Sequence, residues 1–555
     1  MDDGKILIIH LSRLGDMVQS LPALKLLKEE QPHSVITYLG IEDFCHILSG
    51  VPWIDKLVTL PWQEIGSIVG GEKEGSLDAL DQLWNRVPEL AEEYDLLVNL
   101  THNWGSSYLS GRVRARQKRG RMFSDKDEIV VSGKWGKYLF AMTRNQKDNL
   151  LNLVDIYMGM AGVKNRPAGQ FLPTDPVLDQ RCASQLSDLG VQGGKLSVGF
   201  QLGASKPNRA WPLENFIKLG ELLFQHLDAQ IVLFGSERDL VLADRFYEQA
   251  TYPFTSLIGK TRLLELGSFF KGIDLLIGND TGPIHIAAAV GTKVVGIFVS
   301  TAHFGVTGPY GAGHVAIQSN YPCAPCLSST ACYHPLCREN IKPETVEQGV
   351  RLCLGLDEGI AAAGPEASLY RSSFHTDGTL RYRLIGPNAD GFLPWLRSFH
   401  YLKASVSQSL WNDWLGLHSD SADVEVKGKD LRTEEILSAI KTACSSYKKI
   451  YEDGRTLCRK IIDQFQRDKP DIPLVQVMIE SLRQVEERVR DLECPLCILK
   501  EIHEYYMAEM EPCNFPELAH KFLEKYTALR DIITSFEITL KKQNISNQEI
   551  RKERV

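Results

Sequence analysis

The sequence contains no long uninterrupted hydrophobic segment. No apolar run in its 555 residues approaches the roughly 18 residues that a membrane-spanning helix needs. The first residues, MDDGKILIIHLSRLGD, also lack the basic segment and apolar core of a secretory signal. We therefore expect a cytoplasmic protein without a transmembrane segment, and the sequence leaves peripheral membrane association open.

The sequence has no excess of positive charge either. Lys and Arg number 62 against 70 Asp and Glu, which gives a net charge of −8 at pH 7. A protein that binds nucleic acid through its overall charge is basic, so we expect no nucleic-acid partner. Basic residues gather only locally, in GRVRARQKRGR from Gly111 to Arg121.

Short hydrophobic runs alternate with helical patterns over about two-thirds of the chain. KILIIHL, SVITYLG and YDLLVNL in the first part, and LSVGFQLG and AQIVLFGS in the second, have the continuous apolar character of buried parallel strands. Their alternation with helices predicts an α/β fold. We predict one Rossmann-like domain over residues 1–172 and a second over residues 190–356, facing each other across a cleft.

The last part of the chain has a different pattern. ASLYRSSFHTDGTLRYRLIG predicts a β-hairpin around Asp377-Gly378. From Thr433 onward, heptad-like stretches such as LVQVMIESLRQVEERVRDL predict helices. We therefore expect a third, mainly α-helical accessory domain over residues 366–555, and three domains agree with the chain length.

The stretch LLIGNDTGPIHIAAAVGTKVVGIFVS, Leu275 to Ser300, predicts a strand, a tight turn, a helix and a second strand. Its turn matches neither the Walker A loop nor the G-x-G-x-x-G fingerprint. Glycine nevertheless lets a ligand approach the backbone, and the unpaired N–H groups of a helix start attract phosphate. The turn is therefore a candidate anion site.

Three other strand ends carry polar residues. In HLSRLGDMVQSLPAL, the carboxylate of Asp16 can accept a proton from a hydroxyl in the cleft, or it can simply cap the helix. In FQLGASKPNRAWPLENF, the cations Lys206 and Arg209 precede a helix, which suits a diphosphate, although each can equally be a solvated loop charge. In LFGSERD, Glu237 can hydrogen-bond a ribose or be an exposed loop acid.

Together these turns resemble glycosyltransferase family 9, the ADP-heptose:lipopolysaccharide heptosyltransferases. NDTGPIHIAAAVGTKVVGIF resembles the D-T-G-x-x-H signature, LSRLGDMVQSLPAL is similar to S-x-G-D-x-x-x-x-P, and GASKPNRAWPLENF resembles G-A…K-x-W-P-x-x-x-F. Arg209 stands where the family usually has lysine, which keeps the charge but changes its geometry. The resemblance runs from Lys5 to about Leu356. It implies a GT-B fold with the ADP-sugar donor in the C-terminal half and the acceptor in the N-terminal half.

The resemblance also implies roles for individual residues. Asp16 is the general base, and the enzyme inverts the anomeric carbon by single displacement. The donor-binding residues are Ser205, Lys206, Arg209, Glu237, Asp280, Thr281, Gly282 and His285. The acceptor-binding candidates are Arg13, His102 and Asn103. His285 touches the donor or supports the turn, and a purely structural histidine is the alternative.

No divalent metal is needed for transfer in this family, because a helix N-terminus and a cation neutralise the leaving ADP. The D-x-D sequence from Asp125 to Asp127 follows no apolar strand, so we interpret it as a solvated loop.

Twelve cysteines without a secretory signal indicate a reducing compartment. CAPCLSSTACYHPLC brings together Cys323, Cys326, Cys332 and Cys337, and four thiolates in 15 residues can wrap one tetrahedral iron or zinc ion. Chance clustering of reduced cysteines is the alternative. The cluster resembles that of the autotransporter heptosyltransferases, which bind iron through four cysteines and assemble into rings. A second C-x-x-C, Cys494 and Cys497 near His503 and Cys513, is interpreted as free thiols in a helical turn.

These features predict a glycosyltransferase that moves a heptose from ADP-heptose onto a hydroxyl of lipopolysaccharide, of a protein or of another surface glycan. A GT-B enzyme with another nucleotide-sugar donor is one alternative. A non-catalytic nucleotide- or sugar-binding scaffold organised by its metal is the other. We expect the helical domain to serve oligomerisation or acceptor docking, and homo-oligomerisation is left open.

Overall fold

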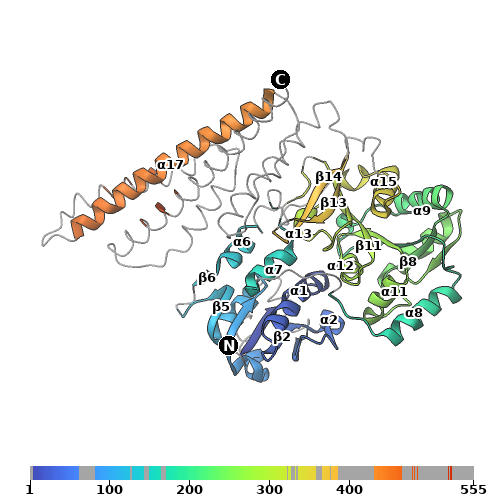
Figure 1. Ribbon diagram of the computed structural model, residues 1–555, viewed down its shortest axis with the longest axis horizontal. Coiled ribbons are helices and arrows are strands. Elements are labelled where there is room, and N and C mark those ends of the chain that lie inside the picture. Colours follow the sequence, from blue (N-terminus) through green and yellow to red (C-terminus); the bar gives the residue numbers. More distant parts are fainter. Residues whose placement is uncertain are drawn as a thin grey trace. The chain divides into compact units, whose positions relative to one another are not determined.

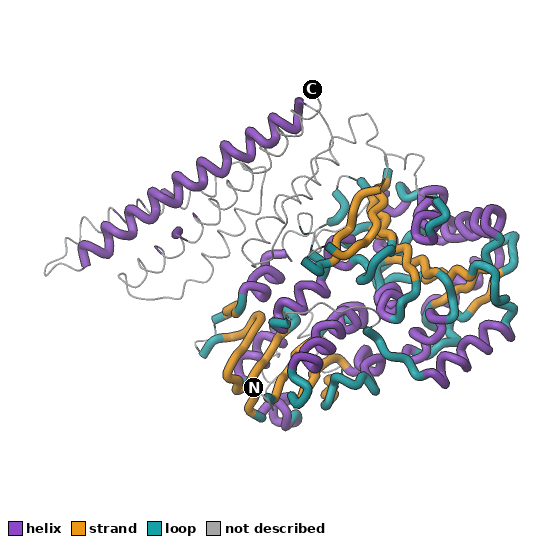
Figure 2. The backbone as a smooth tube through the Cα atoms, in the orientation of Figure 1, coloured by secondary structure: helices purple, strands orange, loops and turns teal. Residues whose placement is uncertain are grey.

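The computed structural model describes most of the first 385 residues and one long helix after them. The described ranges are 4–61, 82–125, 128–142, 149, 151–163, 171–321, 323–326, 332, 336–357, 366–375, 377–385, 431–465 and single positions between 478 and 530. The chain forms two compact units (Figure 1, Figure 2). One unit comprises Met1–Phe140 with Leu150–Pro394, and the other comprises Ala141–Asn149 with Trp395–Val555.

The first unit contains two sheets, as the alternating pattern predicts. The sheet of the N-terminal half, residues 4–163, has the order β3-β2-β1-β4-β5-β6. All its neighbouring strands are parallel except β5 and β6. The strands are β1 Lys5–His10, β2 Val35–Ile41, β3 Lys56–Leu60, β4 Glu93–Asn99, β5 Arg114–Phe123 and β6 Ile129–Ser132. The helices are α1 Leu14–Glu30, α2 Glu42–Cys45, η1 His46–Leu48, η2 Pro88–Ala91, α5 Trp104–Arg112, α6 Lys134–Met142 and α7 Leu153–Ala161.

The sheet of the C-terminal half, residues 171–385, has the order β14-β13-β12-β11-β10-β7-β8-β9. Its strands are β7 Ser197–Gln201, β8 Gln230–Phe234, β9 Phe254–Ser256, β10 Leu275–Asn279, β11 Lys293–Phe298, β12 Val315–Ser319, β13 Ala367–Phe374 and β14 Leu380–Ile385. The helices are α8 Pro176–Asp188, η4 Pro207–Arg209, α9 Leu213–Leu227, η5 Glu237–Asp239, α10 Leu240–Gln249, η6 Leu263–Glu265, α11 Leu266–Lys271, α12 Gly282–Ala289, α13 Phe304–Thr307, α14 Leu336–Glu339 and α15 Pro343–Leu354. This doubly wound pair of halves is the predicted GT-B arrangement.

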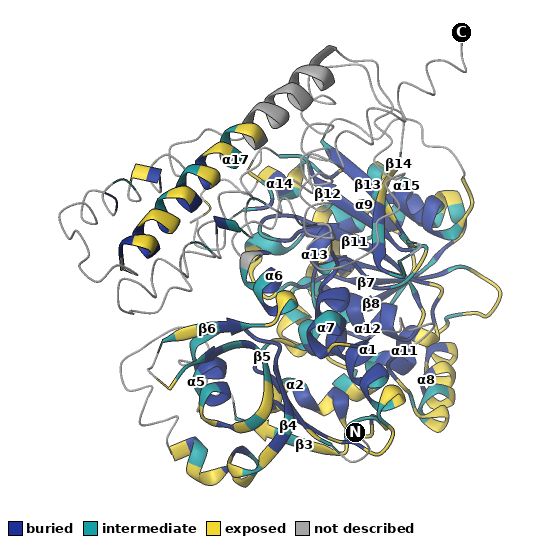
Figure 3. Cartoon of the chain, turned by 60° about the vertical axis from the view of Figure 1, so that its left-hand side comes forward, coloured by how far each residue is buried: buried dark blue, intermediate teal, exposed yellow. Residues whose placement is uncertain are grey.

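The central strands of the C-terminal half are buried on both faces (Figure 3). Aliphatic and aromatic side chains of β7, β8, β10 and β11 share one core with α9 and α15. Trp211, just before α9, is only 2% exposed, and its ring contacts Phe216 edge to face. A continuous apolar run in the sequence therefore corresponds to a strand covered on both sides, as expected for parallel sheets.

The predicted hairpin around Asp377-Gly378 is confirmed, but it extends the second sheet. β13 pairs antiparallel with β14 and also antiparallel with β12. The sequence pattern assigns this hairpin to the third part of the chain, because strand periodicity does not reveal which sheet edge a hairpin joins. The proposed domain limits at residues 172, 190, 356 and 366 stay predictions.

Two cations of the basic cluster from Gly111 to Arg121 bind the carbonyl ends of helices. The Arg119 guanidinium donates to the carbonyls of Met160 at 3.2 Å and Ala161 at 2.6 Å, at the end of α7. The Lys118 ammonium donates to the carbonyl of Gly111 at 2.7 Å, near the end of α5. Cations stabilise the unpaired carbonyls and the negative dipole of a helix C-terminus. Lys118 and Arg119 thus have a structural role in the fold.

Helix α7 joins the two halves of the first unit through buried polar groups. Asp155, fully buried, accepts a hydrogen bond from the Tyr310 hydroxyl at 3.1 Å and another from the Leu380 N–H at 2.9 Å. One turn earlier, the Asn152 amide donates to the Gly308 carbonyl at 2.8 Å. A helix of the N-terminal half therefore holds the hairpin and the loop before β12 in the C-terminal half.

The second unit contains the 35-residue helix α17, Leu431–Phe465, which confirms the expected helix after Thr433. Within this unit the Arg455 guanidinium donates to the Thr527 hydroxyl at 3.1 Å. Among the helices that the structure describes, none combines the length and hydropathy needed to cross a bilayer.

We expect Asp155→Ala to destabilise the first unit by about 2–5 kcal/mol, because it leaves a buried N–H and a buried hydroxyl without their acceptor. Thermal or urea unfolding measures the loss. Asp175→Ala is a matched control, since Asp175 is an exposed carboxylate that caps α8 through the Val177 N–H and should cost only about 1 kcal/mol. Equal losses in the two variants would contradict the joining role of Asp155.

Candidate active site

The predicted site residues follow the strands at which each sheet reverses its order. In the N-terminal half β1 lies between β2 and β4, and in the C-terminal half β7 lies between β8 and β10. At such points the connections leave toward opposite faces of the sheet, which opens a crevice at the carboxyl ends of the strands. Asp16 follows β1 and His102 follows β4. Arg209 follows β7, and Asp280 follows β10.

The turn between β1 and α1 holds the carboxylate of Asp16 at the start of α1. The Ser12 hydroxyl and the Arg13 N–H, the latter at 3.4 Å, both donate to Oδ2 of Asp16. The capping contact that the sequence leaves open is therefore present. Among the described residues, none donates a hydrogen bond to Oδ1 of the half-buried Asp16. One oxygen thus orients the carboxylate, and the other can accept a proton.

A buried polar network supports the end of β1 behind this turn. Nδ1 of His10 bonds the Tyr38 hydroxyl at 2.8 Å, and Nε2 lies 3.3 Å from the Tyr157 hydroxyl. Burial lowers the pKa of His10 to about 3, so its ring is neutral. The sequence analysis did not find this residue, because a histidine in an apolar strand has no distinguishing local pattern.

Two glycines let the first turns of α1 and α12 touch. A Cβ on Gly15 would lie 2.8 Å from Cδ2 of His285, and a Cβ on Gly282 would lie 2.7 Å from a methyl carbon of Leu14. Real Cβ atoms do not come this close, so a side chain at either position would force the neighbouring side chain to move. The contact brings the positive ends of two helices together across the crevice. His285, only 4% exposed, packs into this contact.

Asn279, at the end of β10, ties the turn before α12 to the turn after β7. Its side-chain oxygen accepts from the Trp211 N–H at 2.8 Å, and its amide donates to the Leu202 carbonyl at 3.0 Å and lies 3.4 Å from that of Gly203. Asn279 is fully buried, so these bonds satisfy a group that would otherwise be costly to bury. The sequence analysis did not predict this role of Asn279. The only local indication of it is a polar amide at the end of the apolar run LLIGN.

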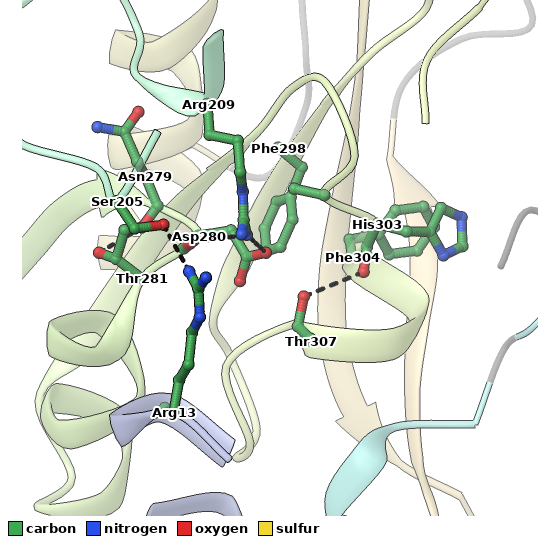
Figure 4. Close-up of polar contacts among 12 residues, drawn as sticks. Arg13, Ser205, Arg209, Asn279, Asp280, Thr281, Phe298, His303, Phe304 and Thr307 are labelled. Atoms are coloured by element: carbon green, nitrogen blue, oxygen red, sulfur yellow. Dashed lines mark hydrogen bonds and ion pairs between the residues drawn. The ribbon is translucent and has the colours of Figure 1, made fainter. Parts of the chain in front are cut away.

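Asp280, in the turn between β10 and α12, forms an ion pair with Arg209, in the turn after β7 (Figure 4). The Arg209 guanidinium donates to the Asp280 carboxylate at 2.6 Å and to its carbonyl at 3.0 Å. Nε2 of His285 lies 3.6 Å from the other carboxylate oxygen. Burial disfavours the charge of Asp280 most strongly, but His285 and Arg209 outweigh it, and the pKa of Asp280 is lowered.

The turn after β8 packs against the turn after β7 through Asp239. A Cβ on Gly203 would collide with the Asp239 carboxylate, which also accepts bonds from the Ser236 N–H at 2.8 Å and hydroxyl at 3.0 Å. The predicted ribose ligand Glu237 is exposed at the start of η5, and Lys206 is exposed before η4. The fold thus brings the turns after β7 and β8 into contact.

Arg13 reaches from the N-terminal half to the turn after β7, which carries Ser205. Its guanidinium donates to the Ser205 hydroxyl at 3.0 Å, as Figure 4 shows. The sequence assigns Arg13 to the acceptor and Ser205 to the donor, so this contact joins two residues with different predicted roles.

The other two acceptor candidates lie on the loop after β4. Asn103 caps α5 by accepting from the Ser106 N–H at 2.8 Å, and its amide donates to the Leu11 carbonyl at 2.9 Å. Both ring nitrogens of His102 are buried and have no hydrogen-bond partner in the described part of the chain. Burial and then the charge of Arg121 lower the pKa of His102 to about 3, so the ring is neutral.

The four cysteines from Cys323 to Cys337 lie close enough to influence one another electrostatically. Burial, followed by the neighbouring Cys323 thiol, raises the pKa of Cys326 to about 11. The Cys326 N–H donates to the Ser300 carbonyl at 2.7 Å, and Cys337 is buried in α14. Within the described residues, no three His, Cys, Asp or Glu side chains already have a metal-binding arrangement. Four thiols are a donor set that suits iron or zinc, but the described residues do not place them around a common ion position.

Two of the predicted features lie outside the described residues. The first is the second C-x-x-C with its neighbours, Cys494, Cys497, His503 and Cys513. The second is the D-x-D sequence, of which Asp127 is not described.

Residues 87–336 match the family model described as glycosyltransferase family 9 (heptosyltransferase). Lipopolysaccharide heptosyltransferase 3 of Escherichia coli K12 is 27% identical over 292 residues, which cover 52% of this chain and 80% of that protein. Lipopolysaccharide heptosyltransferase 1 of Pseudomonas aeruginosa is 25% identical over 356 residues, which cover 60% of this chain and 88% of that protein.

A solved family 9 glycosyltransferase from Veillonella parvula has the same fold. It superposes with a TM-score of 0.51 at 22% identity and covers 64% of this chain and 98% of its own. The motif turns, the paired Rossmann-like halves and these similarities agree. The chain therefore is a glycosyltransferase enzyme with a GT-B fold, and over residues 87–336 it is similar to glycosyltransferase family 9, the heptosyltransferase family.

Proposed function

We propose that this enzyme transfers a heptose from ADP-heptose to a hydroxyl group of lipopolysaccharide, with inversion at the anomeric carbon. The observation that carries the proposal is the contact of α1 and α12, which places the Asp16 turn beside the Asp280-Thr281-Gly282 turn. A base and an anion-binding helix start thus lie on opposite sides of one crevice. The names of the two lipopolysaccharide heptosyltransferases support the sugar and the acceptor class.

The donor diphosphate is assigned to the start of α12. The N–H groups of Thr281 and Gly282 are suited to bind phosphate oxygens, because they have no partners within the helix, whereas Pro283 has no N–H and that of Ile284 donates to the Thr281 carbonyl at 3.2 Å. The ion pair of Asp280 with Arg209 stiffens this turn, and the Asn279 bonds hold it against the turn that carries Ser205. Glu237 is assigned to the ribose.

The proposed reaction is a single displacement. Oδ1 of Asp16 takes the proton of the acceptor hydroxyl as its oxygen forms a bond to the anomeric carbon. The bond from that carbon to the diphosphate breaks at the same time, and its electron pair leaves with ADP. The start of α12 and nearby cations stabilise the charge that develops on the leaving group. Attack from the face opposite the diphosphate inverts the anomeric carbon.

We also propose that Cys323, Cys326, Cys332 and Cys337 hold one structural iron or zinc ion. Four thiolates supply the tetrahedral donor set that both ions accept. The cluster is anchored on Ser300, after β11, through the Cys326 N–H. A bound ion would therefore stabilise the loop beyond β11, and the transfer step needs nothing further from it.

We expect Asp16→Asn to lower transfer about 10²- to 10⁴-fold, because the amide keeps the shape of the carboxylate but accepts no proton. ADP affinity should stay unchanged, since Asp16 itself is assigned to the acceptor hydroxyl and not to the diphosphate. Mass spectrometry of product and calorimetry with ADP measure the two quantities. Asp43→Asn, at an exposed acid of α2, is the control and should keep full activity. Transfer at the wild-type rate in Asp16→Asn would remove the base assignment.

We expect Arg209→Ala to destabilise the protein by about 3 kcal/mol at pH 7, because Asp280 stays buried without its main cation. Its lowered pKa means that ionised Asp280 stabilises the native state above the unfolded pKa of about 3.9, and that this contribution is lost as pH falls through the folded pKa. In the variant the pKa of Asp280 rises, so protonation relieves the buried charge as pH falls.

The difference in unfolding free energy between wild type and Arg209→Ala should consequently be smaller at pH 4.5 than at pH 7. Urea unfolding at the two pH values measures it. Arg209→Lys, which keeps the charge, should lose less stability at pH 7. An identical loss at both pH values would show that Asp280 does not depend on this cation.

We expect about one iron or zinc ion per chain in protein purified without added metal, measured by elemental analysis. Cys326→Ser should lower the metal content and the thermal stability. Cys182→Ser, at a buried free thiol of α8, is the matched control and should retain the metal. Well-folded, reduced wild-type protein without metal would reject the site.

A further inference from the structure

The side chain of Arg13 crosses from the turn that carries the general base to the turn that carries the donor ligands. Its Nη1 donates to the hydroxyl of Ser205 at 3.0 Å, although the two residues lie 192 positions apart. In Figure 4 the guanidinium lies between the start of α1 and the group formed by Ser205, Thr281 and Asp280. Its position is therefore that of a donor ligand supplied by the acceptor half.

The charges around this turn show why a second cation matters. Arg209, the cation that the motif assigns to the diphosphate, is already paired with the buried Asp280 carboxylate at 2.6 Å. The pair as a whole is close to neutral, so it stiffens the turn but offers a diphosphate little net positive charge. Among the described residues, no carboxylate forms an ion pair with the guanidinium of Arg13, which is exposed.

We propose that Arg13 is the cation that binds and neutralises the leaving diphosphate of the donor. The assignment rests on the proposed function and changes the predicted role of Arg13 from acceptor to donor. A guanidinium has five N–H donors, and the bond to Ser205 uses one of them. The others can bind phosphate oxygens in the paired geometry that arginine favours.

This position also connects the two ends of the reaction. The backbone N–H of Arg13 contacts the carboxylate of Asp16 at 3.4 Å, while its side chain reaches Ser205. One short turn thus supplies the base for the acceptor and the cation for the leaving group. Because the charge on the diphosphate grows as the bond to the anomeric carbon breaks, Arg13 interacts more strongly with the transition state than with the bound donor.

The experiment compares ADP with adenosine, which lacks both phosphates, by calorimetry on the full-length protein. We expect Arg13→Ala to weaken ADP binding about 10- to 100-fold and to leave adenosine binding unchanged. It should also lower kcat, and Arg13→Lys should recover part of both losses. Arg114→Ala is the control, since Arg114 pairs with Glu93 at the surface of the same half and should bind ADP normally.

Each other outcome overturns the assignment in a recognisable way. Unchanged ADP affinity with a raised KM for the acceptor would make Arg13 an acceptor residue. Equal losses for ADP and adenosine, together with a lower Tm, would make the bond to Ser205 only a tie between the halves. Wild-type protein that binds adenosine or ADP no better than uridine or UDP would instead overturn the proposed ADP donor itself.

Discussion

The contact between the first turns of α1 and α12 is the constraint on which the rest of the site depends. Helix starts can meet this closely only where side chains are absent, and Gly15 and Gly282 supply that absence. Once they meet, the turn of Asp16 in one half and the amides beside Thr281 in the other lie next to the same contact. Both helices also direct their positive ends toward it, which favours an anion there.

Buried and half-buried polar groups keep the turns around this contact in place. Asn279 joins the turns after β7 and β10, and Asp239 occupies the space that a side chain on Gly203 would fill. The ion pair of Asp280 and Arg209 completes the set. A buried polar group without a hydrogen-bond partner destabilises the folded state by more than a paired one stabilises it. These bonds therefore favour a single arrangement of the turns. The substrate is thereby met by a preformed surface.

Helix α7 extends the same principle to the whole first unit. Asp155 and Asn152 bind backbone groups of the C-terminal half, while Tyr157, on the same helix, contacts His10 behind the turn that carries Asp16. The loop before β12 and the end of β1 are therefore held by one rigid element.

The sequence by itself determined the α/β class, the two doubly wound halves, most strands and the turns that carry polar residues. These features follow from local patterns, because buried parallel strands need apolar runs and phosphate turns need small residues. The same local reasoning singled out Asp16 and Asp280 as candidate site residues.

Only the tertiary structure decided how residues distant in sequence combine. It paired Arg209 with Asp280, brought Arg13 to Ser205, gave His10 and Asn279 their partners and added the hairpin of β13 and β14 to the second sheet. None of these contacts has a local signal, because a charge or an amide in a turn looks the same whether it meets solvent, a ligand or another turn. Chain topology and packing determine which of these it meets.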